Sequence, residues 1–369
     1  MIGSQTGGPS WRHARTGQGG LPCITGTIRR TCLAAVFGAS CGLFLATAAG
    51  AAECAGRDLI GALPAEQRAE LDRAVEGVPY PTGIFWQATR GAARIEIAGT
   101  YHFPDPRHEA TVARMAPLIA QAGALLVEAG PDEEAALTEN LRRDPSLMVD
   151  PTGPTLPERL GPAEWQIVAQ AVEERGMPAV MASRLRPWYV AMLLGLSPCM
   201  MEQAQDLAAR QGLDHRLIDE ARGHDVPVLA LEPWDTLFTL FKGMTPAEEN
   251  DMIRAALPAA RLADDYAATA LEAYFRGDIR AVWEFGRLDA LRNSGLPPGA
   301  VDRQVRLAED RLMTRRNRSW IGPLTRAAEA AAARGKPVVA AFGALHLPGD
   351  TGVLRLLEAE GWTITRGGS

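Results

Sequence analysis

Two histidines far apart in the chain lie in the same local pattern, Gly-x-x-His followed by an apolar residue and a proline. His102 comes three residues after Gly99, and His346 comes three residues after Gly343. Each block directly follows an apolar stretch typical of a β-strand. Glycine lets the chain turn sharply where a strand ends, so that the histidine projects into the crevice above the sheet, where open α/β sheets bind ligands. The repeat predicts that two imidazoles lie at one ligand-binding edge of the sheet. The alternative is that each is a capping or packing residue, which is the more common role of a single histidine at a strand end.

A carboxylate follows a third strand-like stretch. Glu128 closes the apolar run 124–128 and is followed by Ala-Gly. If this strand is parallel to the two histidine-bearing strands, Glu128 emerges at the same edge. Two imidazoles and one carboxylate are a ligand set for a catalytic divalent metal that keeps an open water position. We therefore expect His102, Glu128 and His346 to bind a divalent metal, with manganese, cobalt or zinc as candidates. Glu128 could serve as a metal ligand or as a general base.

A basic segment lies on the last long helical stretch before His346. Residues 315–318 read Arg-Arg-Asn-Arg, and such a run is usually a solvated helix face. If Arg316 instead turns inward with Asn317, its guanidinium could stabilise a developing oxyanion or bind a substrate carboxylate. Glu232 closes another apolar run and could reach the same edge or cap the segment that follows. We assign Arg316 and Asn317 to the catalytic site.

The remaining histidines of this part of the chain are weaker candidates. His108 lies near His102 but is expected to start a helix. His215 and His224 fall in a polar helical stretch and are expected at the surface. The metal hypothesis therefore depends on His102 and His346.

Strand-like and helix-like segments alternate along the chain, which is typical of an α/β sheet covered by helices. The strand candidates are 84–89, 94–98, 124–128, 179–181, 226–231, 338–342 and 362–365. The helical candidates are 109–122, 133–142, 156–175, 201–223, 246–276, 300–334 and 351–360. We predict one α/β domain over 53–369, with a mixed central sheet and a mostly helical insertion at about 246–334, which the Pro-Pro-Gly at 297–299 divides.

The N-terminal segment has the order of a secretory signal peptide. Arg29 and Arg30 precede an apolar run of about 15 residues, shorter than the roughly 20 that a spanning helix needs. Small residues that offer A-x-A cleavage sites follow at 46–52. We expect residues 1–52 to be a cleaved signal peptide and 53–369 to be a periplasmic or secreted chain with no membrane span.

Composition excludes several classes of protein. With 47% hydrophobic and 22% charged residues, the chain is not a disordered protein. The net charge is −6, and removing residues 1–52 deletes four arginines and no acid, giving −10. This acidic balance argues against a nucleic-acid partner.

Of the five cysteines only Cys54 and Cys199 would remain. In an oxidising compartment one disulfide between them is expected, with two buried thiols as the alternative.

Taken together, these segments resemble the TraB/GumN family, which is related to the Tiki metalloproteases and more distantly to erythromycin esterases and ChaN-like haem-binding proteins. The resemblance covers about residues 80–366. Its motifs are Gly99-Thr100-Tyr101-His102, Leu126-Val127-Glu128, Arg186-Pro187-Trp188, Leu231-Glu232, Arg316-Asn317-x-x-Trp320 and the block from Gly343 to Trp362. Tiki-like members are metal-dependent peptidases that use the paired Gly-x-x-His motifs. The resemblance implies metal-ligand roles for His102 and His346 and site roles for Glu128 and Arg316.

The sequence thus predicts an exported, divalent-metal-dependent hydrolase that acts on a peptide or another small-molecule substrate, at a peptide or amide bond. An alternative is a periplasmic binding or regulatory protein without turnover, which captures a peptide or haem-like ligand in the same crevice. A further alternative is an esterase-like hydrolase in which a histidine is the general base and no metal is needed. The oligomeric state and the identity of the substrate do not follow from the sequence.

Overall fold

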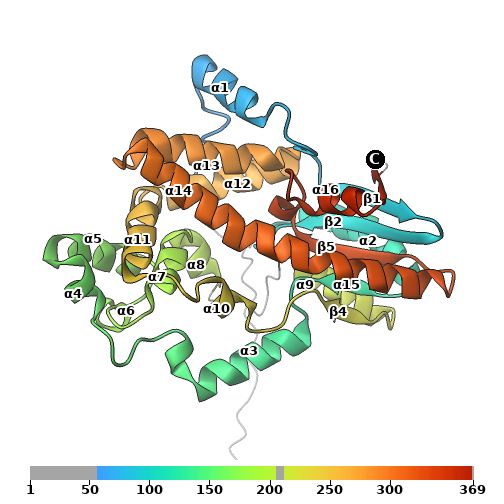
Figure 1. The fold of residues 1–369 in the computed structure, drawn as a ribbon, viewed down its shortest axis with the longest axis horizontal. Helices are drawn as coiled ribbons and strands as arrows, with labels where there is room; N and C mark the ends of the chain where they lie inside the picture. Colours follow the sequence, from blue (N-terminus) through green and yellow to red (C-terminus); the bar gives the residue numbers. More distant parts are fainter. Residues whose placement is uncertain (1–55, 205–211, 368–369) are drawn as a thin grey trace, which may run out of the picture. The chain divides into compact units, whose positions relative to one another are not determined.

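The computed structural model describes residues 56–204 and 212–367, and a six-stranded sheet of mixed direction lies at its centre. The strands are β1 (Phe85–Arg90), β2 (Ala93–Thr100), β3 (Leu125–Val127), β4 (Val228–Ala230), β5 (Val338–Gly343) and β6 (Thr363–Arg366). Their order across the sheet is β4-β3-β5-β2-β1-β6 (Figure 1). The α/β fold with a mixed central sheet is as predicted.

The four strands β4, β3, β5 and β2 are parallel, and β1 and β6 are antiparallel to their neighbours. All six residues of β5 are buried, because this strand lies between two others and is covered on both faces. At the edge, β6 is exposed at Thr363, Thr365 and Arg366 and partly buried only at Ile364, so it is much less covered than β5. The central parallel strands therefore give the sheet its buried core.

Sixteen α-helices surround the sheet in the described residues. They are α1 (Ala65–Val75), α2 (His108–Gln121), α3 (Pro131–Arg143), α4 (Leu156–Leu160), α5 (Pro162–Glu173), α6 (Ala179–Ala182), α7 (Pro187–Leu194), α8 (Pro198–Ala204), α9 (Leu213–Gly223), α10 (Thr236–Leu240), α11 (Pro246–Ala260), α12 (Ala263–Arg276), α13 (Ile279–Asn293), α14 (Pro298–Ala308), α15 (Arg315–Ala332) and α16 (Val353–Ala359). A π-helical turn, Glu309–Thr314, joins α14 to α15.

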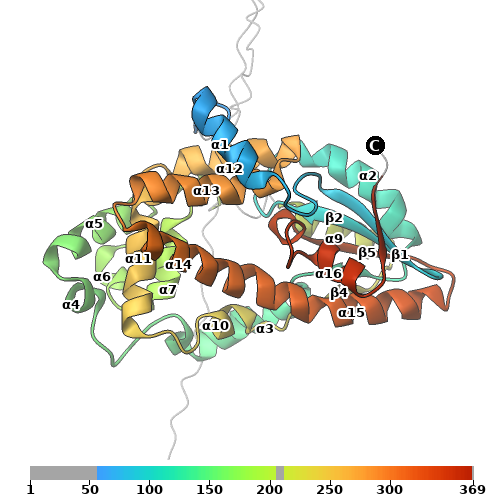
Figure 2. The same ribbon diagram turned by 45° about the horizontal axis from the view of Figure 1, so that its top comes forward.

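The chain crosses the sheet in two directions, which places helices on both faces. From β2 the chain passes through α2 to β3, and α9 leads onward to β4 in the same direction. From β4 it returns through α15 to β5 in the opposite direction. Because such crossovers are right-handed, the two directions require opposite faces. Accordingly α2 packs with α9, and α15 packs with α16 across the sheet from them (Figures 1 and 2).

Each layer is apolar where it meets the sheet. On α2 the buried side chains include Met115 and Ile119, spaced for one helical face. On α15 they include Trp320, Leu324 and Ala328, with the same spacing. These side chains join the strands in one hydrophobic core.

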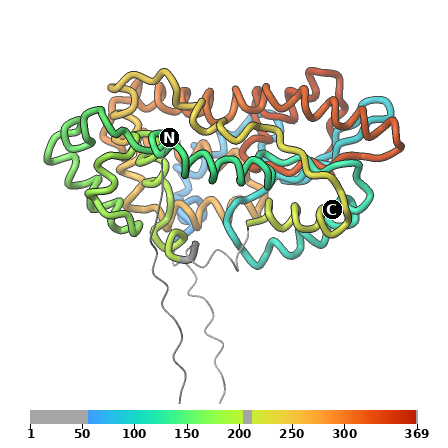
Figure 3. Tube along the Cα trace, turned by 90° about the horizontal axis from the view of Figure 1, so that it is seen from below, coloured from blue at the N-terminus to red at the C-terminus, as the bar shows by residue number. Residues whose placement is uncertain are grey.

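A second core forms among helices away from the sheet. Helices α4–α8 gather at one end (green in Figures 1 and 3) and α11 packs against α7. Their buried contacts include Val168, Leu194 and Ile253. Arg175, only 3% exposed, donates to the carbonyls of Leu194 and Ala260, so one buried guanidinium satisfies the ends of separate helices.

The helical regions differ from the prediction in extent and in one element. Helices fill 131–204 as well as the predicted 246–334, and α13 lies in the gap that the sequence left between two helical stretches. The predicted strand 179–181 is wrong, because these residues form α6 directly after Pro178. Val180 is 78% exposed there, so its apolar side chain did not mark a buried strand.

No helix among the described residues combines the length and the apolar character needed to cross a bilayer. The predicted signal peptide, 1–52, lies outside the described residues, as does Cys54. The signal peptide and the pairing of Cys54 with Cys199 therefore stay predictions.

Candidate functional site

The carboxyl ends of three parallel strands meet at one edge of the sheet. Thr100 of β2 is paired with Gly343 of β5, and Val127 of β3 is paired with Ala341 of the same strand. The residues that follow these positions must therefore leave the sheet side by side. The strand that bears Glu128 is parallel to both histidine-bearing strands, as the prediction required. At this edge β2 and β3 continue toward the α2 and α9 face while β5 continues toward α16, which is the switch point where open α/β sheets bind ligands.

His102 is held by a carboxylate from a distant helix. Its Nδ1 lies 2.8 Å from Oδ2 of Asp214, on the first turn of α9, and the other oxygen of Asp214 accepts a 2.6 Å hydrogen bond from Thr100. Partial desolvation opposes a charge on His102, but the hydrogen bond and charge of Asp214, with the charge of Glu128, raise its pKa to about 9. The side chain is 58% exposed, so His102 is the member of the site that solvent reaches.

A glycine permits the approach of α9 to His102. A Cβ atom on Gly212 would lie 2.0 Å from the carbonyl oxygen of His102, a distance that no side chain tolerates. The backbone N–H of Leu213 then donates to the carbonyl of Tyr101. Gly212 thus brings the first turn of α9, and Asp214 with it, against the first histidine block.

His346 is buried and held from the opposite side by α15. Its Nδ1 lies 2.5 Å from Oδ1 of Asn317, whose Nδ2 donates to the carbonyl of Thr351 across 2.8 Å. Because the Asn317 amide donates through its nitrogen, its oxygen must accept from His346, which assigns the proton to Nδ1 and the lone pair to Nε2. The ring lies 4.4 Å from that of Trp320. Burial, with the positive charge of Arg316, lowers the pKa of His346 to about 3.

Glu128 lies between the two imidazoles. Its Oε1 is 4.0 Å from Nε2 of His102 and 3.8 Å from Nε2 of His346, and it accepts the backbone N–H of Gly343 at 2.7 Å. Burial alone would raise the pKa of Glu128, but the positive charges of Arg316 and His102 and the backbone N–H of Gly343 hold it well below its usual range. Glu128 is therefore a carboxylate near neutral pH.

Gly343 occupies the point on which these side chains converge. A Cβ atom there would lie 3.1 Å from Oε1 of Glu128, 3.3 Å from Nε2 of His102 and 3.5 Å from Cδ2 of His346. Its backbone angles, φ −48° and ψ 129°, suit any residue. The glycine of the second block therefore keeps space open among the three side chains, in addition to allowing a turn.

Arg316 turns inward and is fully engaged by the protein. Its Nε and Nη2 donate to Glu232 at 2.7 and 3.0 Å, and Nη2 also donates to Oε2 of Glu128 at 2.5 Å. Its Nη1 donates to Nε2 of His346 at 3.2 Å and to the carbonyl of Leu312 at 3.3 Å. All five N–H groups thus have acceptors among the described residues. Through these hydrogen bonds Arg316 fixes the positions of Glu128 and His346.

Glu232 is the last member of the polar cluster, which comprises His102, Glu128, Asp214, Glu232, Arg316, Asn317 and His346. It follows β4 and also accepts a 2.9 Å hydrogen bond from Nε1 of Trp320. The cluster then holds three carboxylates, from Glu128, Glu232 and Asp214, against one permanent cation, Arg316. Two negative charges remain, which the proton of His102 compensates in part and which one divalent cation would balance.

The two imidazoles and the Glu128 carboxylate are suitable ligands for a divalent metal. Their ligand atoms lie slightly farther apart than a bound ion requires. Both imidazoles have Nδ1 tied to an oxygen, as metal-binding histidines do, so that Nε2 faces Glu128. Ligand atoms about 2.1 Å from a tetrahedral zinc ion lie roughly 3.4 Å apart, whereas Oε1 of Glu128 lies 3.8 and 4.0 Å from the two Nε2 atoms. No group of three or more His, Cys, Asp or Glu side chains in the described residues is close enough to form a complete metal site. An ion would have to draw these ligands together by about half an ångström.

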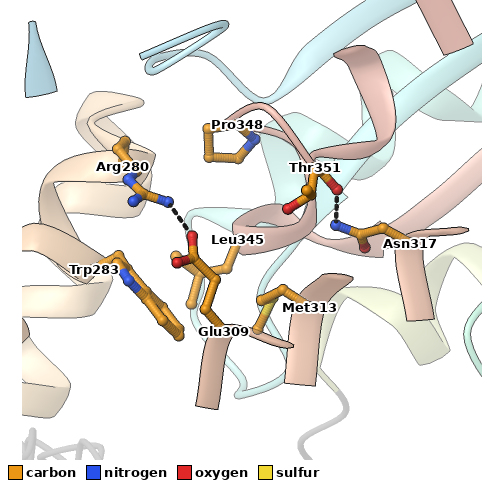
Figure 4. A pocket seen from close by; sticks show the side chains of 8 residues that line it. All are labelled: Arg280, Trp283, Glu309, Met313, Asn317, Leu345, Pro348 and Thr351. Atoms are coloured by element: carbon orange, nitrogen blue, oxygen red, sulfur yellow. Dashed lines mark hydrogen bonds and ion pairs between the residues drawn. The ribbon is translucent and has the colours of Figure 1, made fainter. Parts of the chain in front are cut away.

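A small pocket lies beside Asn317. Figure 4 shows Asn317 bonded to Thr351 on one side of it and the Arg280–Glu309 ion pair on the other. Its volume is about 10 Å³, no more than one water needs. This pocket supports the Asn317 amide and is too small to admit a substrate.

The structure thus brings together His102, Glu128, His346, Arg316 and Asn317. The other histidines lie elsewhere: His108 begins α2 as predicted, and His215 and His224 have side chains 47% and 46% exposed.

Sequence reasoning missed one member of the site, Asp214. Its signal is the close approach that Gly212 allows, but an aspartate on the first turn of a helix is common for local reasons and did not mark a site. Glu232 was considered and left ambiguous, since its role depends on Arg316.

The sequence model of the TraB/PrgY/gumN family matches residues 84–366, most of the chain and all of the polar cluster. No curated protein gives a significant match. The family is the one that the motifs resemble, and the chain belongs to the TraB/PrgY/gumN family.

Proposed function

We propose that this protein is an exported hydrolase that depends on a divalent metal and acts on a peptide or amide bond. One observation carries the proposal: the Nε2 atoms of His102 and His346 face the same carboxylate oxygen of Glu128, at 4.0 and 3.8 Å. Binding of an ion at Nε2 of His102 would displace the proton there and leave the cluster with two negative charges, which supports a dication over a neutral ligand. Export follows from the signal-peptide pattern of residues 1–52.

In this proposal His102, His346 and Glu128 hold the ion, and the ion would replace the Nη1 group of Arg316 at Nε2 of His346. When bound, a divalent metal polarises a carbonyl and lowers the pKa of a water molecule. Asp214 and Asn317 fix the imidazole rings through Nδ1. The lowered pKa of Glu128 suits a ligand better than a general base, whose pKa should lie near the working pH.

Arg316 and Asn317 serve this site as positioning residues. Every donor of Arg316 already meets a protein acceptor, and the Asn317 side chain is bonded at both its oxygen and its nitrogen. Contact between Arg316 and an oxyanion would require one of these bonds to be exchanged. We therefore assign Arg316 the role of orienting Glu128 and His346.

The second candidate function is hydrolysis without a metal. It rests on the bond between His102 and Asp214, since a carboxylate that holds Nδ1 leaves Nε2 to exchange protons with a substrate or a water. The exposure of His102 places that proton within reach of solvent. This candidate also uses the crevice beside Glu128 but needs no ion.

Hydrolysis of a mixed peptide library by the purified protein tests the proposal. Activity should appear with one of manganese, cobalt or zinc, vanish with a chelator, and be lost in Glu128→Gln with binding of peptides retained. Activity that survives chelation would establish the metal-free candidate instead. Binding without hydrolysis under any of these ions would contradict both and favour a binding protein.

A further inference from the structure

A larger cavity lies among helices that come between Glu128 and Arg316 in the chain. Its volume is about 490 Å³, within the range of small-molecule and side-chain pockets. It is formed by the start of α7, by α10 and the turn after it, and by α11 (Figure 1). Its aromatic and charged lining residues are Arg186, Trp188, Phe238, Phe241, Lys242 and Glu249.

Aromatic rings form one wall of this cavity. Trp188 and Phe241 are stacked, with ring centroids 5.1 Å apart and an angle of 6° between the planes. Phe238 meets Trp188 edge-on at 5.8 Å. Trp188 and Phe241 are buried at 4% and 9% exposure, so this wall is fixed by packing, whereas Phe238 is only half-buried. Such a wall recognises a flat apolar group.

Two cations accompany the aromatic wall. Arg186 donates to the carbonyl of Ser146, and no carboxylate of the described residues lies within ion-pair distance of Arg186 or of Lys242. The only acid that lines the cavity, Glu249, is paired with Arg159 at 2.6 Å. In a chain of net charge −6 this pocket therefore presents unpaired positive charge beside aromatic rings.

One residue, Leu312, contacts both the aromatic wall of the cavity and the proposed catalytic centre. The side chain of Leu312 packs with the cluster that contains Trp188, and its carbonyl accepts from Arg316. Glu232 precedes Phe238 by six residues, a stretch that spans at most about 22 Å even when fully extended. An extended peptide of about six or seven residues is therefore long enough to span this distance.

We propose that this cavity is a specificity pocket for the substrate, which binds an aromatic side chain with a carboxylate beside it. The carboxylate is either the C-terminal group of a peptide or an adjacent acidic side chain, because both present the same charge. The substrate role rests on the proposed hydrolase function, whereas the binding chemistry of the pocket does not.

Binding of three peptides to the intact protein, measured by calorimetry, tests the pocket without turnover. The probes are acetyl-Gly-Gly-Phe with a free C-terminus, the same peptide as its C-terminal amide, and acetyl-Gly-Phe-Asp-amide. At least one of the two acidic peptides should bind about tenfold more tightly than the neutral amide, the factor that corresponds to about 1.4 kcal/mol. Which of them binds identifies the source of the carboxylate.

The variants locate the binding. Lys242→Gln should weaken binding of the acidic peptide about threefold, as expected for one exposed charge, and Arg186→Gln/Lys242→Gln should abolish its advantage over the amide. Phe238→Leu should weaken all three peptides. Lys336→Gln, at the only other lysine of the chain, is the matched control and should change nothing. Equal binding of acids and amide by the unmodified protein, or unchanged binding by the double variant, would overturn the proposal.

Kinetics separate this pocket from the catalytic proposal. If the protein hydrolyses peptides, Arg186→Gln/Lys242→Gln should raise KM for acidic aromatic substrates and leave kcat nearly unchanged. A protein that binds the acidic peptide through this pocket and hydrolyses nothing would refute the proposed function and retain the pocket. Hydrolysis with no preference for these peptides would refute the pocket alone.

Discussion

His102 and Asp214 are 112 positions apart in the chain, yet Nδ1 of the histidine lies 2.8 Å from Oδ2 of the aspartate. The bond joins the loop after β2 to the first turn of α9. It fixes the orientation of the imidazole and leaves Nε2 directed at Glu128. This carboxylate–histidine pair is the contact through which α9 contributes to the site.

Replacing Asp214 by Asn should impair the site while the fold remains. The amide keeps the size of the side chain but removes the charge that stabilises His102, and loss of such a partner typically costs 10- to 100-fold in metal affinity or activity. Metal affinity and kcat/KM would both be measured. Asp219→Asn, on the same helix with a side chain 53% exposed, is the matched control. Equal behaviour of the two variants would contradict a role for Asp214.

Adding one methyl group at Gly343 should block the site. The backbone there accepts alanine, but the new Cβ would press on Oε1 of Glu128 at 3.1 Å and on Nε2 of His102 at 3.3 Å. These neighbours would have to move by a few tenths of an ångström, and misplacement of catalytic groups by about 1 Å can cost a hundredfold in activity. We expect Gly343→Ala to fold with a similar melting temperature and to lose activity by about tenfold. Gly286→Ala, on α13 where nothing lies within 4 Å of the new Cβ, should stay active. Full activity of Gly343→Ala would show that the space beside Gly343 is not used.

Arg316 should be the most costly single charge to remove. Arg316→Met leaves Glu128 and Glu232 without their cation, and breaking such a partly buried cluster should lower the free energy of unfolding by about 3 kcal/mol. Denaturant titration measures the loss. The neighbouring Arg315 is 62% exposed and pairs only with Asp310, so Arg315→Met should change the unfolding free energy by less than about 0.5 kcal/mol.

A second variant tests whether charge is the cause of that loss. Adding Glu232→Gln to Arg316→Met removes one of the two stranded carboxylates and should recover part of the stability. A double variant less stable than Arg316→Met would mean that packing, and not charge balance, dominates at this position.

Acid should destabilise the protein in part through His108. The ring is fully buried, its Nε2 is bonded to the carbonyl of Phe103, and burial lowers its pKa below the ordinary 6.5. As the pH falls below about 6.5 the unfolded chain takes up this proton first, so the free energy of unfolding falls by up to about 1.4 kcal/mol per pH unit. Above that pH both states are neutral and the effect is absent.

The contribution of His108 is isolated by difference. Chemical unfolding between pH 7 and pH 5 should show a shallower loss of stability in His108→Gln, which keeps a donor for the Phe103 carbonyl. His224→Gln, at an exposed histidine, should follow the unmodified protein. Parallel curves for all three proteins would mean that His108 does not contribute.

The sequence predicted which residues meet at the carboxyl edge of the sheet, but not the residues that surround and orient them. Strand periodicity and the Gly-x-x-His repeat sufficed to bring His102, Glu128 and His346 together, because residues after parallel strands leave the sheet at one edge. The partners that orient them could not be foreseen. Asp214 reaches His102 only through the packing of α9, and the full engagement of Arg316 depends on groups from three separate elements.

The errors in secondary structure have the same origin. Residues 179–181 are apolar and short, which suited a strand, but they lie among the helices of the second core and start directly after a proline. α13 fell between the two predicted helical stretches, although Ile279, Val282, Phe285 and Leu288 recur at helical spacing. Ile279 joins the core of the sheet, whereas Phe285 and Leu288 pack in a separate cluster with residues of α1 and α12.

The central claim is that His102 and His346 hold a divalent metal with Glu128. Elemental analysis of the purified protein beside the His102→Ala/His346→Ala variant, after both are loaded with manganese, cobalt or zinc and desalted, tests it most directly. We predict about one ion per chain in the unmodified protein, as expected for a single catalytic site, and none in the variant. Equal metal content in the two proteins would contradict the claim.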